Sequence, residues 1–346
     1  MHFISYIIPV RNENFHIEST IMSIINQRHE DMLFEIIVVD GMSIDGTRAK
    51  IEVLKKKFNE ILMIDNPEKI VSSGFNRALT LSKGDFIVRV DGHAELSPDF
   101  LKNSLDQFNF TNADCVGGPI KHISNNIIGK SISVAQRSKF GSGGASFRGL
   151  IKSGKYVNTL AFGVYKRDVF KKIGGYDIEL VKNQDDEFNF RMIQNKLKIW
   201  LHPSIKSYYY NRVSILGLIK QYFQYGFYKI RVFQKRGGFT SIRHLIPLLF
   251  FLTICFTVAI YFIYKTTFLF ITLITIYLFF SIFFTIIETV FLKQNKKFLF
   301  LLPICFLSMH LSYGVGSLFG LIYFSCKWFD NRLLDTYFDR EVFHCK

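Results

Sequence analysis

The sequence has few of the residues that build disulfide-rich or metal-knuckle proteins. An odd number of cysteines and the absence of CxxC spacing make a disulfide framework or a zinc knuckle unexpected, and a reducing compartment suits such thiols. The chain also lacks a Lys/Arg-rich block and the interleaved aromatic residues of an RNA-binding domain, so nucleic acid is not expected as a partner. The five cysteines are Cys115, Cys255, Cys305, Cys326 and Cys345.

The N-terminus has no positively charged segment before its first apolar run. That run, at residues 3–10, is too short for the hydrophobic core of a secretory signal and is typical of a β-strand. Lys and Arg outnumber Asp and Glu by 43 to 28, and the net charge of +15 suits anionic lipid headgroups or phosphate-bearing substrates. We therefore expect the N-terminal part to stay in the cytoplasm.

Composition divides the chain into two parts. Hydrophobic residues make up 49% of the 346 residues, and the longest apolar runs come after residue 244. The length favours a catalytic domain of roughly 200–240 residues with an appendage. We expect a catalytic domain at 1–212, an aromatic and basic interfacial helix within 213–244, a membrane domain at 245–326 and a tail at 327–346.

Three apolar runs, at 245–264, 268–292 and 298–324, each have about the 20 residues needed to cross a hydrocarbon core. Pro303 and several glycines make the third run less regular, so a broken, re-entrant form is the alternative to three crossings. The two forms place the C-terminal tail on opposite sides of the membrane.

Positive charge predicts the orientation of these runs. Lys293, Lys296 and Lys297 lie between the second and third runs, whereas Lys265 alone lies between the first two. By the positive-inside rule, the loop at 293–297 and the catalytic domain face the cytoplasm. The predicted protein is a multi-pass component of the cytoplasmic (inner) membrane.

Short apolar runs alternate with helical patterns through the first ninety residues. This βαβαβαβ order predicts an α/β, Rossmann-like domain with a mostly parallel central sheet, with its site at the carboxyl edge of the strands. A Gly- and Ser-rich stretch at 113–149 is expected to be a flexible active-site loop. Strands are expected at 3–10, 34–40, 61–65 and 85–91, and helices at 17–26, 47–58 and 73–81.

Four motifs occur in a fixed order along this domain. They are SYIIPVRNE at 5–13, VVDGMSIDGT at 38–47, VRVDGHAELSPDF at 88–100 and NQDDEFNFR at 183–191. Together they resemble the motifs of family 2 inverting glycosyltransferases of glycosyltransferase-A fold, and the resemblance covers roughly residues 3–235. With QYFQYG at 221–226 and the membrane segment, the chain looks like the succinoglycan-type exopolysaccharide glycosyltransferases.

The resemblance implies contacts with a nucleotide-sugar donor along the sheet edge. Asp40 would accept an N–H of the nucleobase, and the alternative is that it only caps the turn before Ser43. Gly41 stands where the family often has an acidic residue. The expected donor-binding residues are Pro9, Asn12, Glu13, Asp40, Asn76 and Asp91.

The resemblance also implies a metal site and a general base. Asp91-Gly92-His93 stands in the place of the family's Asp-x-Asp, so Asp91 and His93 are the expected metal ligands. A divalent ion neutralises charge on the departing diphosphate, and an imidazole ligand favours Mn²⁺ over Mg²⁺. Alignment assigns the base to Asp185, with the adjacent Asp186 as the alternative.

Residues 221–225 resemble the Gln-x-x-Arg-Trp signature of processive synthases with its Arg and Trp replaced, which disfavours processivity. Gln221, Gln224 and Tyr225 are expected on the acceptor side. The predicted reaction moves a sugar from a nucleotide-diphosphate donor to a lipid-linked acceptor, by resemblance an undecaprenyl diphosphate-linked oligosaccharide for exopolysaccharide or another envelope glycan. The alternatives are a polyprenyl-phosphate glycosyltransferase, which needs no base, and a non-enzymatic membrane scaffold or transporter.

Overall fold

The computed structural model of the protein describes residues 2–27, 32–143, 151–211, 213–238, 242–291 and 295–329. These residues form two compact units. The sheet unit contains residues up to 121 and from 151 to 210, and the helical unit contains 122–143 and the described residues from 211 to 329. This division differs from the predicted boundary at 212, because residues 122–143 belong to the helical unit.

The sheet unit is built on an eight-stranded sheet of order β3-β2-β1-β4-β9-β6-β10-β8. Strands β1 to β4 run parallel, while β9 is antiparallel to its neighbours β4 and β6, and β8 is antiparallel to β10. A second sheet has the order β5-β11-β7. The strands are β1 (His2–Val10), β2 (Met32–Asp40), β3 (Ile61–Asp65), β4 (Phe86–Arg89), β5 (Ala94–Leu96), β6 (Cys115–Gly117), β7 (Ile120–Ile123), β8 (Lys155–Val157), β9 (Val164–Lys166), β10 (Ile199–Leu201) and β11 (Ser207–Tyr210).

Helices cover this sheet, which explains why its central strands are apolar on both faces. Ile7 and Ile8 of β1 and Ile37 and Val38 of β2 are all 0% exposed, although successive side chains point to opposite faces. Right-handed crossovers put α1 and α2 on one face and α3 on the other. The helices are α1 (Ile17–Ile25), α2 (Thr47–Lys57), α3 (Val71–Leu81), α4 (Phe100–Phe110), α7 (Arg167–Ile173) and α8 (Gln184–Gln194).

Strand register brings the polar strand ends to one edge of the sheet. Val10 pairs with Asp40, and Asp40 pairs with Asp65, so β1, β2 and β3 end at the same level. Arg89, the last residue of β4, pairs with Ile7 of β1. The predicted α/β class and the polar carboxyl edge are therefore confirmed.

The prediction of a flexible loop at 113–149 is wrong for its described part. Residues 113–143 contain β6, β7 and two helices, α5 (Ile127–Arg137) and α6 (Lys139–Ser142). Strands of three or four residues are too short to show an alternation, and pairing with distant strands stabilises them. Asn126 caps α5 by accepting a hydrogen bond from the Gly129 N–H at 2.7 Å.

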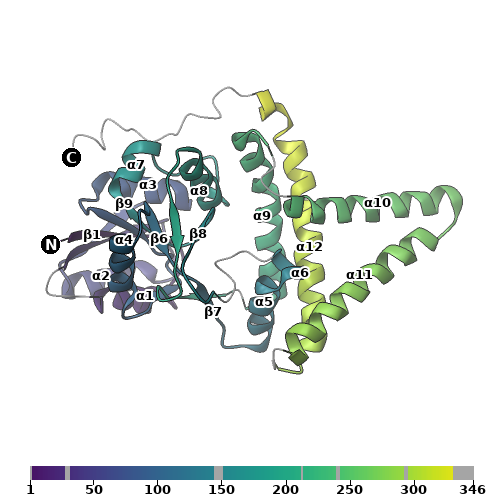
Figure 1. The fold of residues 1–346 in the computed structure, drawn as a ribbon, viewed down its shortest axis with the longest axis horizontal. Coiled ribbons are helices and arrows are strands. Elements are labelled where there is room, and N and C mark those ends of the chain that lie inside the picture. The colour runs from purple at the N-terminus through teal and green to yellow at the C-terminus, as the bar shows by residue number, and fades with distance from the viewer. Residues whose placement is uncertain are drawn as a thin grey trace. The chain divides into compact units, whose positions relative to one another are not determined.

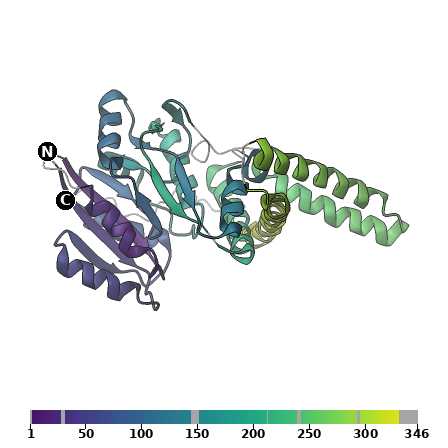
Figure 2. The same ribbon diagram turned by 90° about the horizontal axis from the view of Figure 1, so that it is seen from below.

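The helical unit is dominated by four long helices. In Figure 1, α9 lies along α12, while α10 and α11 form a hairpin beside that pair; Figure 2 shows the same hairpin from below. Three helical stretches are long and apolar enough to cross a membrane: Ile246–Tyr264, Phe268–Val290 and Phe298–Tyr323. The long helices are α9 (Ile215–Arg236), α10 (Ile246–Tyr264), α11 (Phe268–Ile286) and α12 (Phe298–Tyr323).

The third apolar run is one continuous helix, so the re-entrant alternative is wrong. Pro303 lies within α12, and the glycines of this helix allow close packing instead of breaking it. A Cβ on Gly316 would lie 2.1 Å from the Phe223 carbonyl oxygen of α9, and one on Gly314 would lie 2.4 Å from the Pro247 carbonyl oxygen of α10. Small residues permit such backbone approach between membrane helices.

Some predicted features lie outside the described residues. They are the end of the Gly- and Ser-rich stretch at 144–149, positions 292–294 beside the lysine loop, and the tail from residue 330.

Candidate active site

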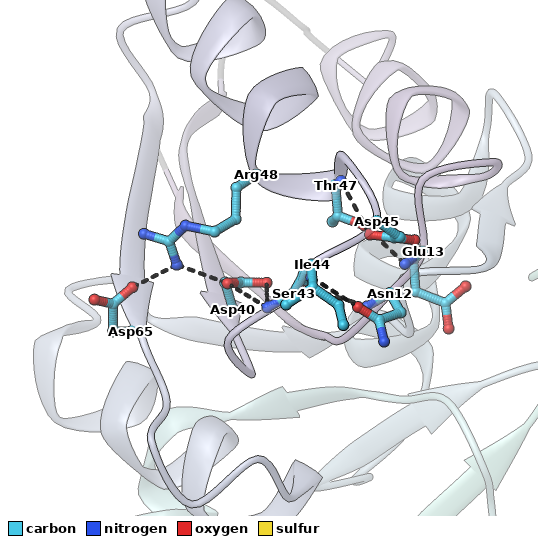
Figure 3. A network of polar contacts seen from close by, with 9 residues as sticks. All are labelled: Asn12, Glu13, Asp40, Ser43, Ile44, Asp45, Thr47, Arg48 and Asp65. Carbon is cyan, nitrogen blue, oxygen red and sulfur yellow. Dashed lines mark hydrogen bonds and ion pairs between the residues drawn. The ribbon is translucent and has the colours of Figure 1, made fainter.

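A polar network joins the carboxyl ends of β2 and β3 to α2 (Figure 3). Asp40 is fully buried and accepts a hydrogen bond from the Ser43 N–H at 3.0 Å. Arg48, in the first turn of α2, contacts Asp40 at 2.6 Å and Asp65 at 2.7 Å. The turn cap considered for Asp40 is therefore present, while its contact with a nucleobase stays a prediction. Arg48, with a side chain 38% exposed, is the accessible cation of this network.

A second part of the network fixes the end of β1. The backbone of Asn12 is in the left-handed region, with φ of 56°. Asparagine adopts this conformation more readily than most residues, and tight turns use it. Its N–H donates to Ser43 Oγ at 2.8 Å, and its Oδ1 accepts from the Ile44 N–H at 3.0 Å. Pro9 is buried in β1 opposite Val39. Both predicted donor residues thus lie at or beside the sheet edge, with Asn12 bonded to the neighbouring loop.

Arg89 and Asp91 form a largely buried ion pair at the end of β4. The Arg89 Nη2 lies 2.9 Å from the Asp91 Oδ1, and the two side chains are 6% and 20% exposed. Burial favours a raised pKa for Asp91, but the charge and the hydrogen bond of Arg89 oppose it, and this pKa lies below its usual range. Asp91 is therefore ionised, as a carboxylate ligand of a metal ion must be.

Asp185 lies in the first turn of α8, where the helix dipole favours negative charge. Burial raises the pKa of Asp185, and the positive charge of Arg89 opposes that rise. The N–H of Asp186 donates to the Asp185 Oδ1 at 3.0 Å. A hydrogen bond thus joins the two candidate bases. The positive charge of the buried Arg89 acts to lower the pKa of both Asp185 and Asp91.

Glu187, also in this motif, stabilises the fold through Arg191. Glu187 forms a bidentate pair with Arg191, whose Nη2 also donates to the Gly175 carbonyl oxygen at 2.7 Å. This links α8 to the turn that precedes Tyr176. Glu187 is therefore engaged structurally, which leaves Asp185 and Asp186 as the candidate bases.

Asn76 binds the same turn from α3. Its Nδ2 donates to the Tyr176 carbonyl oxygen at 2.7 Å, and its Oδ1 accepts the Tyr176 N–H at 2.8 Å. Both polar groups of this buried amide are used within the protein, across 100 residues of sequence. Asn76 thus holds Tyr176 in place, and a direct contact with the donor stays a prediction.

His93 lies beside Glu13 and not within a multi-carboxylate cluster. Its Nδ1 is 2.8 Å from the Glu13 Oε1. Among the described residues, no group of three or more His, Cys, Asp or Glu side chains is arranged to hold a metal ion. A site with Asp91 and His93 would therefore need other ligands, such as diphosphate oxygens and water, to complete the coordination.

Three predicted acceptor-side residues lie on α9 in the helical unit. The Gln221 Nε2 donates to the Tyr225 hydroxyl at 2.9 Å, and Gln136 of α5 donates to the Gln221 Oε1 at 3.4 Å. Gln224 is half-buried on the same helix. Two of the three are thus joined directly, and their role toward an acceptor stays a prediction.

Sequence reasoning missed Arg89 and Arg48. Arg89 stands inside the apolar run of β4, where a buried cation needs an anionic partner, and this anomaly is the signal that could have revealed it. Its guanidinium also lies over the Tyr176 ring, with the Cζ 5.5 Å from the centroid. Arg48 gave a weaker signal: it lies in the first turn of α2, where the helix dipole disfavours a cation that has no anionic partner.

Comparison with known proteins finds one matching family and relatives that align over most of the chain. The family model described as "Glycosyl transferase family 2" matches residues 5–174. The chain is 33% identical over 275 residues to a Methanococcus voltae protein named dolichyl N-acetyl-alpha-D-glucosaminyl phosphate 3-beta-D-2,3-diacetamido-2,3-dideoxy-beta-D-glucuronosyltransferase, covering 76% of this chain and 84% of the relative. It is 30% identical over 245 residues to the succinoglycan biosynthesis protein ExoA of Rhizobium meliloti, covering 70% of this chain and 73% of the relative.

A solved structure shows the same fold. The mannosyltransferase PcManGT from Pyrobaculum calidifontis, in complex with GDP-Man and Mn²⁺, matches with a TM-score of 0.51 at 17% identity, over 69% of this chain and 66% of that chain. At this identity the likeness concerns the fold alone. The motifs, the glycosyltransferase-A fold and the two relatives that align over most of the chain show that the chain belongs to glycosyl transferase family 2. It is a glycosyltransferase with three C-terminal apolar helices.

Proposed function

We propose that the enzyme transfers a sugar from a nucleoside diphosphate sugar to a hydroxyl group of a lipid-linked acceptor, with inversion at the anomeric carbon. The observation that carries this proposal is the placement of two carboxylates: Asp91 follows β4 and pairs with the buried Arg89 at 2.9 Å, and Asp185 lies in the first turn of α8. One carboxylate would hold the divalent ion that neutralises the departing diphosphate, and the other would take the proton of the attacking hydroxyl.

The donor side needs a divalent ion, and the residues present fit one. Asp91 supplies an ionised oxygen and His93 a ring nitrogen, both from the turn after β4. A bound divalent ion would neutralise the negative charge that develops on the leaving diphosphate. The mixed oxygen and nitrogen ligands favour Mn²⁺ over Mg²⁺. Asp40 and Asn12 would hold the nucleoside at the ends of β2 and β1.

The acceptor side needs one base for a direct displacement. Asp185 would remove the hydroxyl proton as that oxygen attacks the anomeric carbon, and Asp186 is the alternative. The raised pKa of Asp185 makes it a stronger base than an exposed aspartate.

The acceptor is proposed to be an undecaprenyl diphosphate-linked oligosaccharide, used for exopolysaccharide or another envelope glycan. One relative is named for transfer to a dolichyl N-acetylglucosaminyl phosphate and another for succinoglycan biosynthesis, which supports a sugar hydroxyl on a lipid carrier. A carrier of this kind stays in the bilayer, so an enzyme with apolar helices meets it there. Gln221 and Tyr225 are proposed to face it.

We place the sheet unit and the loop at 293–297 in the cytoplasm of a cell with this enzyme in its inner membrane. Lys296 and Lys297 follow α11, and Arg243 precedes α10. Single cysteines introduced at these positions in intact cells test the orientation. Labelling of position 296 by a membrane-impermeant reagent would contradict it.

The chemistry is tested with purified full-length protein in lipid. Each of several nucleotide sugars is supplied with Mn²⁺ and extracted lipid-linked oligosaccharides, and release of nucleoside diphosphate is followed. We expect release that depends on both acceptor and metal. Release that is unchanged without acceptor would contradict a transferase of this kind, and activity with polyprenyl phosphate that survives in Asp185→Asn would support the phosphate-acceptor alternative.

A further inference from the structure

Glu13 lies in the turn between β1 and α1, and its backbone is fixed at both ends. Its N–H donates to Thr47 Oγ1, at the first residue of α2, at 2.8 Å. Its carbonyl oxygen accepts the N–H groups of His16 and Ile17 at 3.0 and 2.9 Å. These three hydrogen bonds fix the backbone of Glu13, whose side chain is 21% exposed.

The Glu13 carboxylate meets the imidazole of His93. The Oε1–Nδ1 distance is 2.8 Å, and the His93 side chain is 19% exposed. The ring of Tyr209, in β11, packs edge-on against the imidazole, with centroids 4.6 Å apart and planes at 70°. These two contacts set both the position and the plane of the ring. Within the part of the chain that the structure describes, no hydrogen bond uses the other ring nitrogen, Nε2.

Gly92 allows this contact by bringing the two loops close together. A Cβ at this position would lie 2.7 Å from Val10 Cγ1 and 3.1 Å from Glu13 Cγ. The Gly92 carbonyl oxygen accepts a hydrogen bond from Thr20 Oγ1 at 3.1 Å, which holds the turn against α1. A side chain between Asp91 and His93 would therefore push the turn away from Glu13.

We infer that Glu13 is a positioning residue whose carboxylate accepts the Nδ1–H of His93 and so presents Nε2 of that ring to a divalent ion. The inference rests on the proposed function, in which His93 is a ligand. A carboxylate on the far nitrogen of a ligating histidine fixes its tautomer and increases its basicity. Glu13 was expected among the donor contacts, and this geometry gives it a different task.

The inference predicts a loss of metal affinity that needs no turnover to be seen. Partners of this kind typically contribute about 10- to 100-fold in metal affinity. In Glu13→Gln the charge is lost, and the amide can also donate to Nδ1 and select the wrong tautomer. In Glu18→Gln, an exposed position on α1, the same change of charge should leave metal affinity unaltered.

The experiment measures Mn²⁺ binding to the full chain in lipid nanodiscs by electron paramagnetic resonance, with saturating UDP and, in parallel, GDP. Mn²⁺ should bind about 10- to 100-fold more weakly to Glu13→Gln than to the wild type. In a His93→Ala background, Glu13→Gln should cause no further loss, because its effect acts through the imidazole. Wild-type affinity in Glu13→Gln, or a full additional loss in the double variant, would overturn the inference.

The outcomes separate this inference from the proposed function. Failure of the wild type to bind Mn²⁺ with either nucleotide would overturn both, whereas normal wild-type binding with an unaffected Glu13→Gln would overturn only the role of Glu13. Gly92→Ala provides a second route, since it displaces the turn and leaves both polar side chains present. It should weaken Mn²⁺ binding in the same direction, and melting temperatures show whether each variant is folded.

Discussion

Two largely buried ionisable side chains, Arg89 of the sheet unit and His310 of the helical unit, are bonded in different ways. In the sheet unit, Arg89 pairs with Asp91, but its Nε and Nη1 have no hydrogen-bond partner among the described residues. In the helical unit, both nitrogens of His310 are bonded, to the Tyr277 hydroxyl and to the Phe140 carbonyl oxygen, each at 3.0 Å. Unpartnered buried donors cost stability, so those of Arg89 suit a residue that serves the reaction, whereas the two bonds of His310 serve packing. The units should therefore respond differently to mutation.

The largest effect is expected from Asp185→Asn in the sheet unit. A general base typically supplies a factor of roughly a hundred to ten thousand, so transfer should fall by that amount while donor binding persists. Initial rates and equilibrium binding of the nucleotide sugar measure the two effects. Asp186→Asn is the matched control, and turnover that falls only in this second variant would move the base to Asp186.

Removal of Arg89 should change the pH dependence of the same reaction. Burial raises the pKa of Asp185, and the charge of Arg89 opposes this. Because the base acts only when ionised, kcat falls as the pH falls through this raised pKa. Loss of the cation should move this acidic limb to higher pH by about 1–3 units in Arg89→Met. A pH–rate profile measures it.

Arg77→Met is the control for that experiment. Arg77 is exposed and pairs with Glu68 on the surface, so its loss should leave the profile unchanged. An Arg89→Met profile that matches the wild type, with normal folding, would separate Arg89 from the base.

In the helical unit, the largest effect should be on stability. Gly316→Leu places a side chain where even a Cβ would lie 2.1 Å from the Phe223 carbonyl oxygen, so α9 and α12 must separate. Overpacking of this kind costs about 1–3 kcal/mol. Thermal unfolding in detergent measures it. Ile304→Phe adds bulk at an exposed position of the same helix and should have little effect, so equal destabilisation by both would contradict the packing account.

His310→Phe should give the smallest effect. An aromatic ring stays at this position, while the bonds to Tyr277 and Phe140 are lost, at a cost of about 1 kcal/mol. Tyr277→Phe removes only one of these bonds and should cost less. Melting temperature and transfer rate are measured together; a loss of transfer as large as in Asp185→Asn with an unchanged melting temperature would assign His310 to the chemistry.

The sequence could predict the features that depend on local patterns of residues. Strands β1 to β4 follow from apolar runs such as that of Ile36 to Val39, and residues after a parallel strand must lie at its carboxyl edge. The three apolar helices follow from length alone. Local patterns of this kind need no knowledge of distant residues.

The features that the sequence could not predict depend on long-range contacts. Asn76 resembles a site residue until its amide is seen bonded to Tyr176, 100 positions away. The glycines of α12 suggest a broken helix until the backbone of α9 is seen against them. Strand β6 has three residues, too few for a periodic signal, and it is stabilised by pairing with β9 and β10.

The most direct test of the account is the anomeric configuration of the lipid-linked product. Nuclear magnetic resonance of the sugar attached by the wild-type enzyme from an α-linked nucleotide sugar reports this configuration. A single displacement, with Asp185 as base, predicts a β-linked sugar on a hydroxyl of the acceptor glycan. An α-linked product, or a sugar attached to phosphate, would contradict the central claim.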